Sequence, residues 1–313
     1  MIILNNQMQK QLQALMPRLT DTHPSYNYLD QLSGKLIAGS IGENSLSYYF
    51  HLAPLEGHEI IFGVRLKEDD YFFQIDCLLL TPHVIHLIEV KHIKGELSLN
   101  SMEQLLRASS NQTEVFPNPL IQAKTQAYKL KKTLRQLGCA DIPIHPYVVF
   151  THPTAILNFP SATVDMIPLQ RLPNHIKVIN NLYKNNEHYE ISKIYNIILE
   201  RHCPNKENLM LKYNLEIEHI IRGVRCRNCN NFSMERMHQS WKCSICNTLD
   251  RHAHLEALKD YAHIFGPAIR NKDAQYFLKV SSPDICYRLL NHIPCSVQGS
   301  NKGRIYYLNS LIN

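Results

Sequence analysis

Three ionisable residues on two adjacent predicted strands could form a catalytic centre. Asp76 lies in the apolar run 72–80, and Glu89 and Lys91 lie in the run 85–91. Both runs are short and rich in β-branched or aromatic residues, with turn residues between them, so we predict neighbouring strands. Alternate side chains of a strand share a face, which places Glu89 and Lys91 together with Asp76 opposite them across the ladder.

Two acids and a lysine on an otherwise apolar sheet indicate metal-assisted hydrolysis. Burying these groups is costly unless each has a partner or a metal. Two carboxylates suit Mg²⁺ or Mn²⁺, and Lys91 could hold and activate an attacking water, with Gln74 orienting that water or a phosphate. The chemistry predicted is phosphodiester cleavage. The alternative is a structural ion pair between Glu89 and Lys91, with Asp76 solvated.

The spacing of these residues resembles the core of PD-(D/E)xK nucleases, with Asp76 as the first acid and Glu89-Val90-Lys91 as the second half. More narrowly, residues 38–151 resemble the nuclease-related domain (NERD) family. The further motifs that carry this likeness are Gly42-Glu43, Gln74-Ile75-Asp76, Gly95 and Asn118-Pro119-Leu120-Ile121-Gln122. Cys77 stands where such domains often have His, and His92-Ile93 where a polar and an aromatic residue are usual. The resemblance implies a restriction-endonuclease-like α/β core, a central mixed sheet flanked by helices, that processes DNA.

Two flanking helices could bring further polar groups to this centre. Glu43 is expected in the first turn of a helix extending to residue 52, either as an outer metal ligand or water-positioning group, or simply complementing the helix dipole. Asn118-Pro119 predicts the start of a helix to about Gly138, with Gln122 in its first turn contacting phosphate or water. This second helix carries a basic face, either solvated or phosphate-contacting: Lys124, Lys129, Lys131, Lys132 and Arg135.

The remaining elements of this region are predicted from apolar periodicity. We expect strands at 58–66, 95–99 and 144–150, the last near a sheet edge at its start because of Pro146, and helical segments over 170–202 that complete an α/β layer. Residues 101–113 are predicted to be a mobile loop. Glu68-Asp69-Asp70 is predicted to be a solvated acidic turn.

Four cysteines predict a structural zinc site. Cys226 and Cys229 form one CxxC pair, and Cys243 and Cys246 form a second after thirteen intervening residues. Two such knuckles complete a tetrahedral Cys₄ site for Zn²⁺. Arg225 and Arg227 beside the first knuckle, with Arg222 and Trp241, hint at a nucleic-acid-facing surface, although core packing explains Trp241 equally well.

The C-terminal residues predict a winged-helix-like domain. Three helical segments are expected near 255–265, 271–280 and 283–291, followed by a hairpin with a basic tip around 299–303. Exposed residues of the third helix, and of the hairpin, would contact DNA: Tyr287, Arg288, Asn291, His292, Lys302 and Arg304. The alternative is a small helical domain that docks a protein.

Composition supports a nucleic-acid partner for the C-terminal third. Of the 33 Lys+Arg and 27 Asp+Glu, residues 203–313 hold 15 and 9, so this part carries the whole net charge of +6. Such a surplus suggests an anionic partner, nucleic acid before membrane. Nine cysteines without a disulfide-like framework, and no apolar run of signal or membrane-spanning length, predict a cytoplasmic protein. The seventeen histidines contain no HExxH motif, and we assign none a role.

These observations predict five segments and one leading function. The segments are an N-terminal helical brace (1–37), the nuclease-like domain (38–202), a linker (203–222), a zinc ribbon (223–250) and the winged-helix-like domain (251–313). The leading hypothesis is a metal-dependent DNA nuclease. The alternatives are a non-cleaving DNA-binding regulator on the same fold, or a tail that recruits a protein such as a helicase. Oligomeric state is not predicted.

Overall fold

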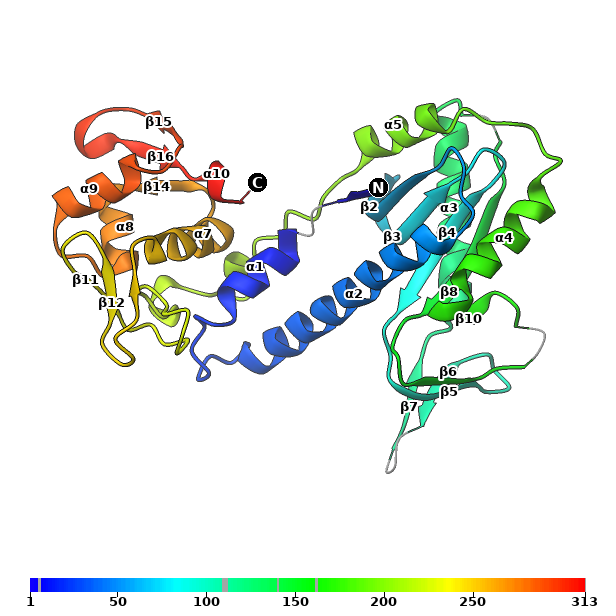
Figure 1. The fold of residues 1–313 in the computed structure, drawn as a ribbon, viewed down its shortest axis with the longest axis horizontal. Coiled ribbons are helices and arrows are strands. Elements are labelled where there is room, and N and C mark those ends of the chain that lie inside the picture. Colours follow the sequence, from blue (N-terminus) through cyan, green and yellow to red (C-terminus); the bar gives the residue numbers. More distant parts are fainter. Residues whose placement is uncertain (5–6, 109–111, 140, 161–162, 313) are drawn as a thin grey trace. The chain divides into compact units, whose positions relative to one another are not determined.

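The computed structural model describes residues 1–4, 7–108, 112–139, 141–160 and 163–312 (Figure 1). The chain divides into two compact units, one formed by residues 1–6 and 35–205 and the other by residues 7–34 and 206–313.

The first unit is built on a six-stranded mixed sheet in the order β1-β2-β3-β4-β8-β10. Its strands are β1 (Ile2–Ile3), β2 (Glu59–Glu68), β3 (Tyr71–Leu80), β4 (Ile85–Lys91), β8 (Ile144–Phe150) and β10 (Met166–Pro168). β2, β3 and β4 pair antiparallel, whereas β1 with β2, β4 with β8, and β8 with β10 pair parallel. β10 pairs only with Val148 to Phe150, so Pro146 lies where β8 has a neighbour on one side alone. The predicted central mixed sheet is confirmed.

Helices cover both faces of this sheet. α3 (Pro119–Gln136) and α5 (Ile191–Arg201) cover one face, which we call the α3 face, where Ala123 and Ile194 join the same cluster as Leu87. α2 (Tyr26–Leu52) and α4 (Leu172–Tyr183) cover the opposite α2 face, where Leu46 and Ile176 pack with Ile88. Fully burying a Leu or Ile side chain stabilises the fold by roughly 1.5–3 kcal/mol. These two layers therefore hold the sheet, and with it the predicted catalytic strands, in place.

A second, four-stranded sheet contradicts the predicted loop at 101–113. Its order is β7-β6-β5-β9, formed by β5 (Gly95–Leu99), β6 (Leu105–Ala108), β7 (Thr113–Phe116) and β9 (Ala155–Asn158). Leu97 and Leu105 are fully buried against Val148 and Phe150 of the main sheet. This apolar anchor explains why the polar stretch forms strands. Residues 109–111 of the predicted loop lie outside the described part.

The helix that carries Glu43 begins much earlier than predicted. α2 extends for 27 residues from Tyr26, so Glu43 lies in its interior and not in its first turn. Gly34, Gly39 and Gly42 lower helix propensity and obscured this continuity. The dipole explanation for Glu43 is therefore wrong, because that effect is confined to the first turn.

The second unit begins with the predicted N-terminal brace. α1 (Gln7–Leu15) packs in this unit, where the Gln11 side chain donates to the carbonyl of Ile264 at 3.3 Å. Arg18 is fully buried and binds Asp260 at 2.8 Å. Residues 1–37 are thus not one brace against the nuclease-like core: β1 extends the main sheet and the following helix belongs to the other unit.

Residues 203–222 are packed, which corrects their prediction as a linker. This segment contains α6 (Leu209–Lys212) and a short 3₁₀ turn, η2 (Ile217–His219). Its buried side chains include Leu209, Leu215 and Ile220. A small antiparallel sheet follows, with β11 (Met234–Arg236), β12 (Trp241–Cys243) and β13 (Leu249–Asp250) in that order.

The C-terminal part combines helices with a small antiparallel sheet. Its elements are α7 (Ala253–Phe265), β14 (Ala268–Arg270), α8 (Asn271–Leu278), α9 (Pro283–Asn291), β15 (Ser296–Gln298), the short 3₁₀ turn η3 (Asn301–Gly303), β16 (Ile305–Tyr307) and α10 (Asn309–Ile312). A further 3₁₀ turn, η1 (Leu169–Arg171), belongs to the first unit. The three strands pair in the order β14-β16-β15. Ser282 caps α9 by accepting from the amide of Ile285. β14, which the sequence did not predict, pairs with β16 and so ties the hairpin to the helices.

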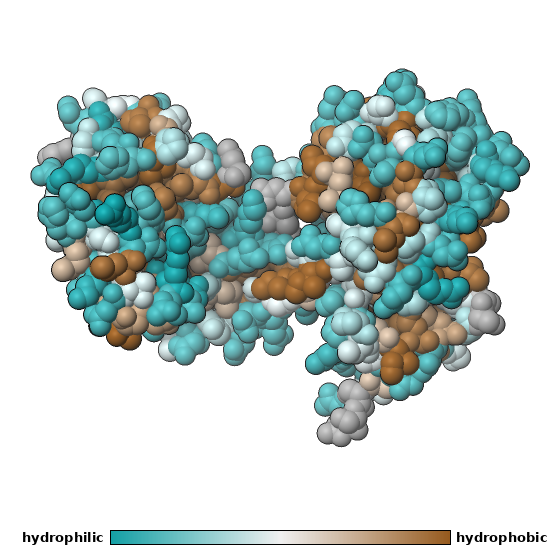
Figure 2. Space-filling model, in the orientation of Figure 1, coloured by the Kyte–Doolittle hydropathy of each residue, from teal (hydrophilic) through white to brown (hydrophobic). Residues whose placement is uncertain are grey.

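Apolar residues are interspersed with hydrophilic ones on the surface in view (Figure 2). Within the described part of the chain, no helix is long and apolar enough to cross a membrane.

Candidate active site and metal centre

Glu89 is the most deeply buried acid of the predicted site. Its side chain is 1 % exposed and lies on the α3 face, because Ile88 and Val90 on either side of it pack on the α2 face. One carboxylate oxygen, Oε1, accepts from Lys91 Nζ at 2.6 Å, and Lys91 also donates to Gln122 Oε1 of α3 at 3.3 Å. The other oxygen, Glu89 Oε2, is buried without a hydrogen-bond partner. A buried carboxylate oxygen without a donor is costly unless a cation binds it.

Asp76 lies at a break in the main sheet. Phe62 of β2 pairs with Cys77 of β3, and both pack on the α2 face. The pair two positions away, Val64 with Ile75, packs on the α3 face instead. The alternation of faces therefore breaks at Asp76 and at Gly63 opposite it, where Gly63 has a φ of +69°. Such a conformation favours glycine.

Beyond the break, the side chain of Asp76, and not its backbone, bonds to β4. Asp76 Oδ2 accepts from the backbone amide of Val90 at 2.9 Å, which fixes it beside the next residue, Glu89. Burial and the charge of Glu89 raise the pKa of Asp76 above its usual range. The structure thus brings Asp76, in the middle of β3, beside Glu89 and Lys91 at the end of β4.

Glu43 approaches from the α2 face. Gly42 lets α2 lie close to the sheet: a Cβ there would be 3.0 Å from Thr151 Oγ1 and 3.1 Å from Val90 Cγ1. Burial, then repulsion by Asp76 and Glu89, raises the pKa of Glu43 to about 8. Three carboxyl groups thus share a poorly solvated region, where a divalent cation would relieve their mutual repulsion.

The donor set of Asp76 and Glu89 fits a divalent cation. Carboxylate oxygens are the donors Mg²⁺ and Mn²⁺ prefer. Among the described residues, the groups of three or more ligand atoms within 4.8 Å of one another do not include Glu43 with Asp76 and Glu89.

Gln74 does not share a face with Glu89 and Lys91. Its neighbours Phe73 and Ile75 pack on the α3 face, so the exposed Gln74 side chain points to the opposite face. The prediction that Gln74 stands beside these residues is wrong, because it assumed unbroken alternation along β3.

Sequence reasoning missed the residues that support this edge. Thr151 Oγ1 contacts His92 Nδ1 at 3.0 Å, and the Thr151 amide donates to the Lys91 carbonyl at 2.9 Å. The Gly42-Glu43 pair was the available pattern, since a glycine before a functional acid in a helix indicates close packing.

The four predicted zinc cysteines converge. Their sulfur atoms all lie within 4.8 Å of one another, with Cys226 to Cys246 at 3.5 Å and Cys229 to Cys243 at 3.6 Å. A tetrahedron of Zn–S bonds of about 2.3 Å has sulfurs about 3.8 Å apart. These thiols therefore fit a Cys₄ zinc site.

The two knuckles have the same backbone. In each, the first cysteine carbonyl accepts from the amide four residues on, Asn230 at 2.9 Å and Asn247 at 3.0 Å. Both asparagines have left-handed φ, 60° and 59°, which asparagine tolerates. A hydrogen bond from the Thr248 side chain lowers the pKa of Cys246 to about 5, which favours the thiolate that binds metal.

Trp241 is a core residue and not part of a nucleic-acid surface. Its side chain is buried, and the indole Nε1 donates to His254 Nδ1 at 3.2 Å. The packing alternative for Trp241 is thus the one the structure supports.

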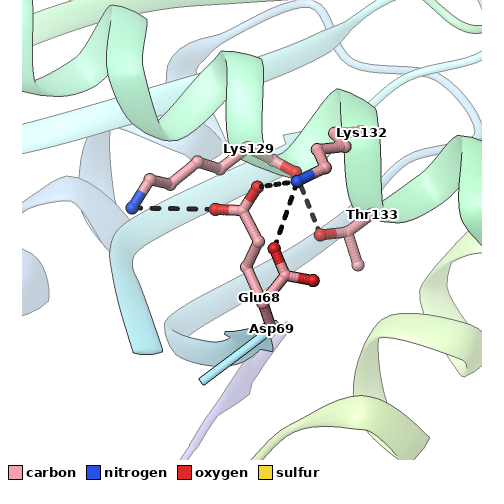
Figure 3. A network of polar contacts seen from close by, with 5 residues as sticks. All are labelled: Glu68, Asp69, Lys129, Lys132 and Thr133. Carbon is pink, nitrogen blue, oxygen red and sulfur yellow. Dashed lines mark hydrogen bonds and ion pairs between the residues drawn. The ribbon is translucent and has the colours of Figure 1, made fainter. Parts of the chain in front are cut away.

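The basic residues of α3 bind acids of the same unit (Figure 3). Lys132 lies 2.9 Å from Glu68 and 3.4 Å from Asp69, and Lys129 lies 3.7 Å from Glu68. Lys131 and Arg135 both pair with Asp141. Glu68 therefore anchors α3, contrary to its prediction as part of a solvated turn, whereas the Asp69 side chain stays 74 % exposed. Lys129, Lys131, Lys132 and Arg135 are thus already paired with acids.

The predicted DNA-contacting residues of α9 are exposed. Tyr287, Arg288, Asn291 and His292 point outward, whereas Cys286, Leu289 and Leu290 are buried. Arg304 Nη1 donates to the hydroxyl of Tyr287 at 3.1 Å, so Arg304 contacts α9 instead of projecting from the hairpin. The Lys302 side chain lies outside the described part.

The arginines of the first zinc knuckle make local contacts. Arg225 is exposed and donates to the carbonyl of Asn230, and Arg227 lies 3.3 Å from Asp250. Both keep part of their guanidinium available to solvent.

Comparison with known families agrees with this geometry. Residues 38–151 match the nuclease-related domain family. The NERD segment contains Glu43, Asp76, Glu89, Lys91 and Gln122, and its bounds confirm the resemblance predicted from the sequence.

One solved structure is similar over part of the chain. The small subunit of a heterodimeric restriction endonuclease is similar in structure, with 15% sequence identity over 51% of this chain and 77% of that subunit, and a TM-score of 0.17. A TM-score this low supports no conclusion about function. No curated protein matches the sequence significantly.

Proposed function

We propose that the NERD unit is a nuclease that hydrolyses phosphodiester bonds of DNA with Mg²⁺ or Mn²⁺. The observation that carries the proposal is Glu89, a buried carboxylate with one oxygen bound to Lys91 and the other without a donor, beside a second carboxylate on Asp76. A structural ion pair would not require Asp76 or leave Glu89 Oε2 without a partner.

Asp76 and Glu89 would hold the metal ion, which when bound would stabilise charge on the phosphate and lower the pKa of water. Lys91 is oriented by Glu89 and Gln122 and would place its ammonium beside the attacking water. Glu43, which approaches from the α2 face, would act as an outer ligand or hold a water molecule near the cation. Gln122 would contact a phosphate oxygen or the water.

The second unit would bind the nucleic acid. Its basic surplus, the exposed face of α9 and the exposed arginines at the first knuckle support this role. The zinc ion would hold the ribbon together without touching substrate, because four cysteines leave no open position.

The test compares cleavage of plasmid and linear DNA by the full chain with Mg²⁺ or Mn²⁺. Asp76→Asn and Glu89→Gln should each reduce the rate by at least about 100-fold, since they weaken the cation site while keeping size. Glu68→Gln is the matched control, because Glu68 is an ion-paired acid of the same unit that anchors α3. The proposal fails if the Asp76 and Glu89 variants cleave as the wild type does, or if no variant or wild type cleaves DNA.

A further inference from the structure

A second group of possible metal ligands lies in the NERD-containing unit. It consists of His145 on β8, Asp165 just before β10, and His175 on α4. His145 Nε2 is 3.1 Å from Asp165 Oδ1, and His175 Nε2 is 3.8 Å from the same oxygen. The ligand atoms of all three residues lie within 4.8 Å of one another.

This group is separate from the proposed active site. β8 pairs in parallel with β4 such that Phe150 lies beside Lys91, and His145 lies five residues earlier on β8. At about 3.3 Å for each strand residue, the two sites are roughly 17 Å apart along the strand. His145 also lies on the α2 face with Tyr147, whereas Glu89 and Lys91 lie on the α3 face.

The spacing of the three ligand atoms fits a transition-metal ion. Bonds of about 2.0–2.1 Å in a tetrahedron place the ligand atoms about 3.3 Å apart, between the two observed separations. The side chains of His145, Asp165 and His175 are 16 %, 25 % and 12 % exposed, so the group is largely desolvated but still reachable by an ion.

Neighbouring side chains fix the two imidazoles. His145 Nδ1 contacts the hydroxyl of Tyr183 at 3.3 Å, which leaves Nε2 directed at Asp165. The ring of His175 packs edge-on against Tyr147 with centroids 4.7 Å apart. Partners that orient ligating histidines in this way are typical of metal sites.

His175 provides the independent observation that a ligand is expected here. Its Nε2 is buried and has no hydrogen-bond partner. A buried ring nitrogen without a partner carries a desolvation cost that coordination would remove.

We propose that His145, Asp165 and His175 bind a zinc-type divalent ion that joins α4 to β8 and to the segment before β10. Two imidazoles and one carboxylate favour such an ion over Mg²⁺, which prefers an all-oxygen site. Three protein ligands leave a position for water, unlike the Cys₄ site. The alternative is that no ion binds and that His145 is simply hydrogen-bonded to Asp165, with His175 beside them.

The test counts metal in the full chain. The count is made in an Asp76→Asn, Glu89→Gln background, so that the carboxylate site proposed above takes up no ion. After loading with Zn²⁺ and removing the excess, elemental analysis should give two zinc ions per chain with His175 intact and one with His175→Ala. The matched control is His51→Ala, an exposed histidine on α2, which should keep two. If His175→Ala fails to fold, Asp165→Asn provides the same comparison in a variant of nearly unchanged shape.

Cobalt distinguishes the two sites without any activity assay. Thiolate-to-cobalt charge-transfer absorption marks the Cys₄ site, and His175→Ala should retain it while losing weaker ligand-field absorption and one bound Co²⁺. One metal ion per chain with His175 intact, or two in both His175→Ala and Asp165→Asn, overturns the proposal. Neither result depends on whether the protein cleaves DNA.

Discussion

Replacing Glu43 with Gln should stabilise the NERD-containing unit when no catalytic metal is bound. Burial and the charges of Asp76 and Glu89 raise the pKa of Glu43 to about 8 from an ordinary value of 4.5. Its carboxyl group ionises above pH 4.5 in the unfolded chain but only near pH 8 in the folded one. The stability that its neutral form gives is therefore complete below pH 4.5 and is lost as pH rises to about 8.

The size of this loss follows from the two pKa values. At 1.36 kcal/mol for each pKa unit, the difference between 8 and 4.5 sets an upper limit of about 5 kcal/mol. Because Glu43 is partly exposed, solvent screening reduces the effect, and we expect about 2–3 kcal/mol. Gln resembles the neutral acid and does not ionise. Glu43→Gln should thus match the wild type at pH 4 and exceed its free energy of unfolding by about 2–3 kcal/mol at pH 9.

The assay is thermal unfolding between pH 4 and pH 9 in buffer without added Mg²⁺ or Mn²⁺. For a unit of this size the gain corresponds to roughly 4–12 °C at pH 9. Glu56→Gln, at an exposed position, is the control and should leave the pH dependence unchanged. Adding Mg²⁺ should raise the wild-type midpoint more than that of Glu43→Gln. A Glu43→Gln midpoint equal to or below the wild type at every pH refutes the reasoning.

Four further perturbations test other parts of the structure. Gly63→Ala places a Cβ at φ +69° and should cost about 1–2 kcal/mol in thermal unfolding while reducing DNA cleavage, and a neutral effect on both would contradict the role of the strand break. Arg18→Met leaves the Asp260 charge without its partner and should cost about 3–5 kcal/mol, against less than about 1 kcal/mol for Arg222→Met, whose guanidinium stacks on Tyr276. Removing zinc with a chelator should shift the fluorescence of Trp241, the only tryptophan, to that of a solvated indole, and an unchanged spectrum would show that the ribbon folds without metal. Arg288→Ala should weaken DNA binding and lower its salt dependence by about one counterion, whereas binding unchanged at low and high salt would remove α9 from the interface.

Local patterns in the sequence were sufficient to predict most elements and the cluster of four cysteines. The strand at 144–150, the helix start at Asn118-Pro119 and the two CxxC pairs depend on residues close in sequence, and the structure places each as predicted. Asp76 and Glu89 were also predicted to be neighbours, since they pair across one short turn.

Features that depend on distant residues could not be predicted. Gln74 was assigned to the wrong face because the side chains of β3 reverse direction at Asp76, opposite Gly63 of β2, and an isolated glycine in a strand does not reveal its φ. Glu68, which pairs with Lys129 and Lys132 of α3, lies 64 residues before Lys132, so these two lysines could not be distinguished from free ones. Likewise His145, Asp165 and His175 come from three separate elements and have no motif spacing.

The break at Gly63 also explains how the candidate active site is assembled. Glu43 comes from the α2 face and Glu89 from the α3 face, so an unbroken sheet would separate their carboxylates by its full thickness. Asp76 lies at the position where the alternation reverses. Its charge raises the pKa of Glu43, and the charge of Glu89 in turn raises the pKa of Asp76. In the proposed nuclease, the acids of the two layers would share one site because β2 and β3 change face together at this point. A mutation that restores regular alternation should disconnect Glu43 from the site while leaving the sheet intact.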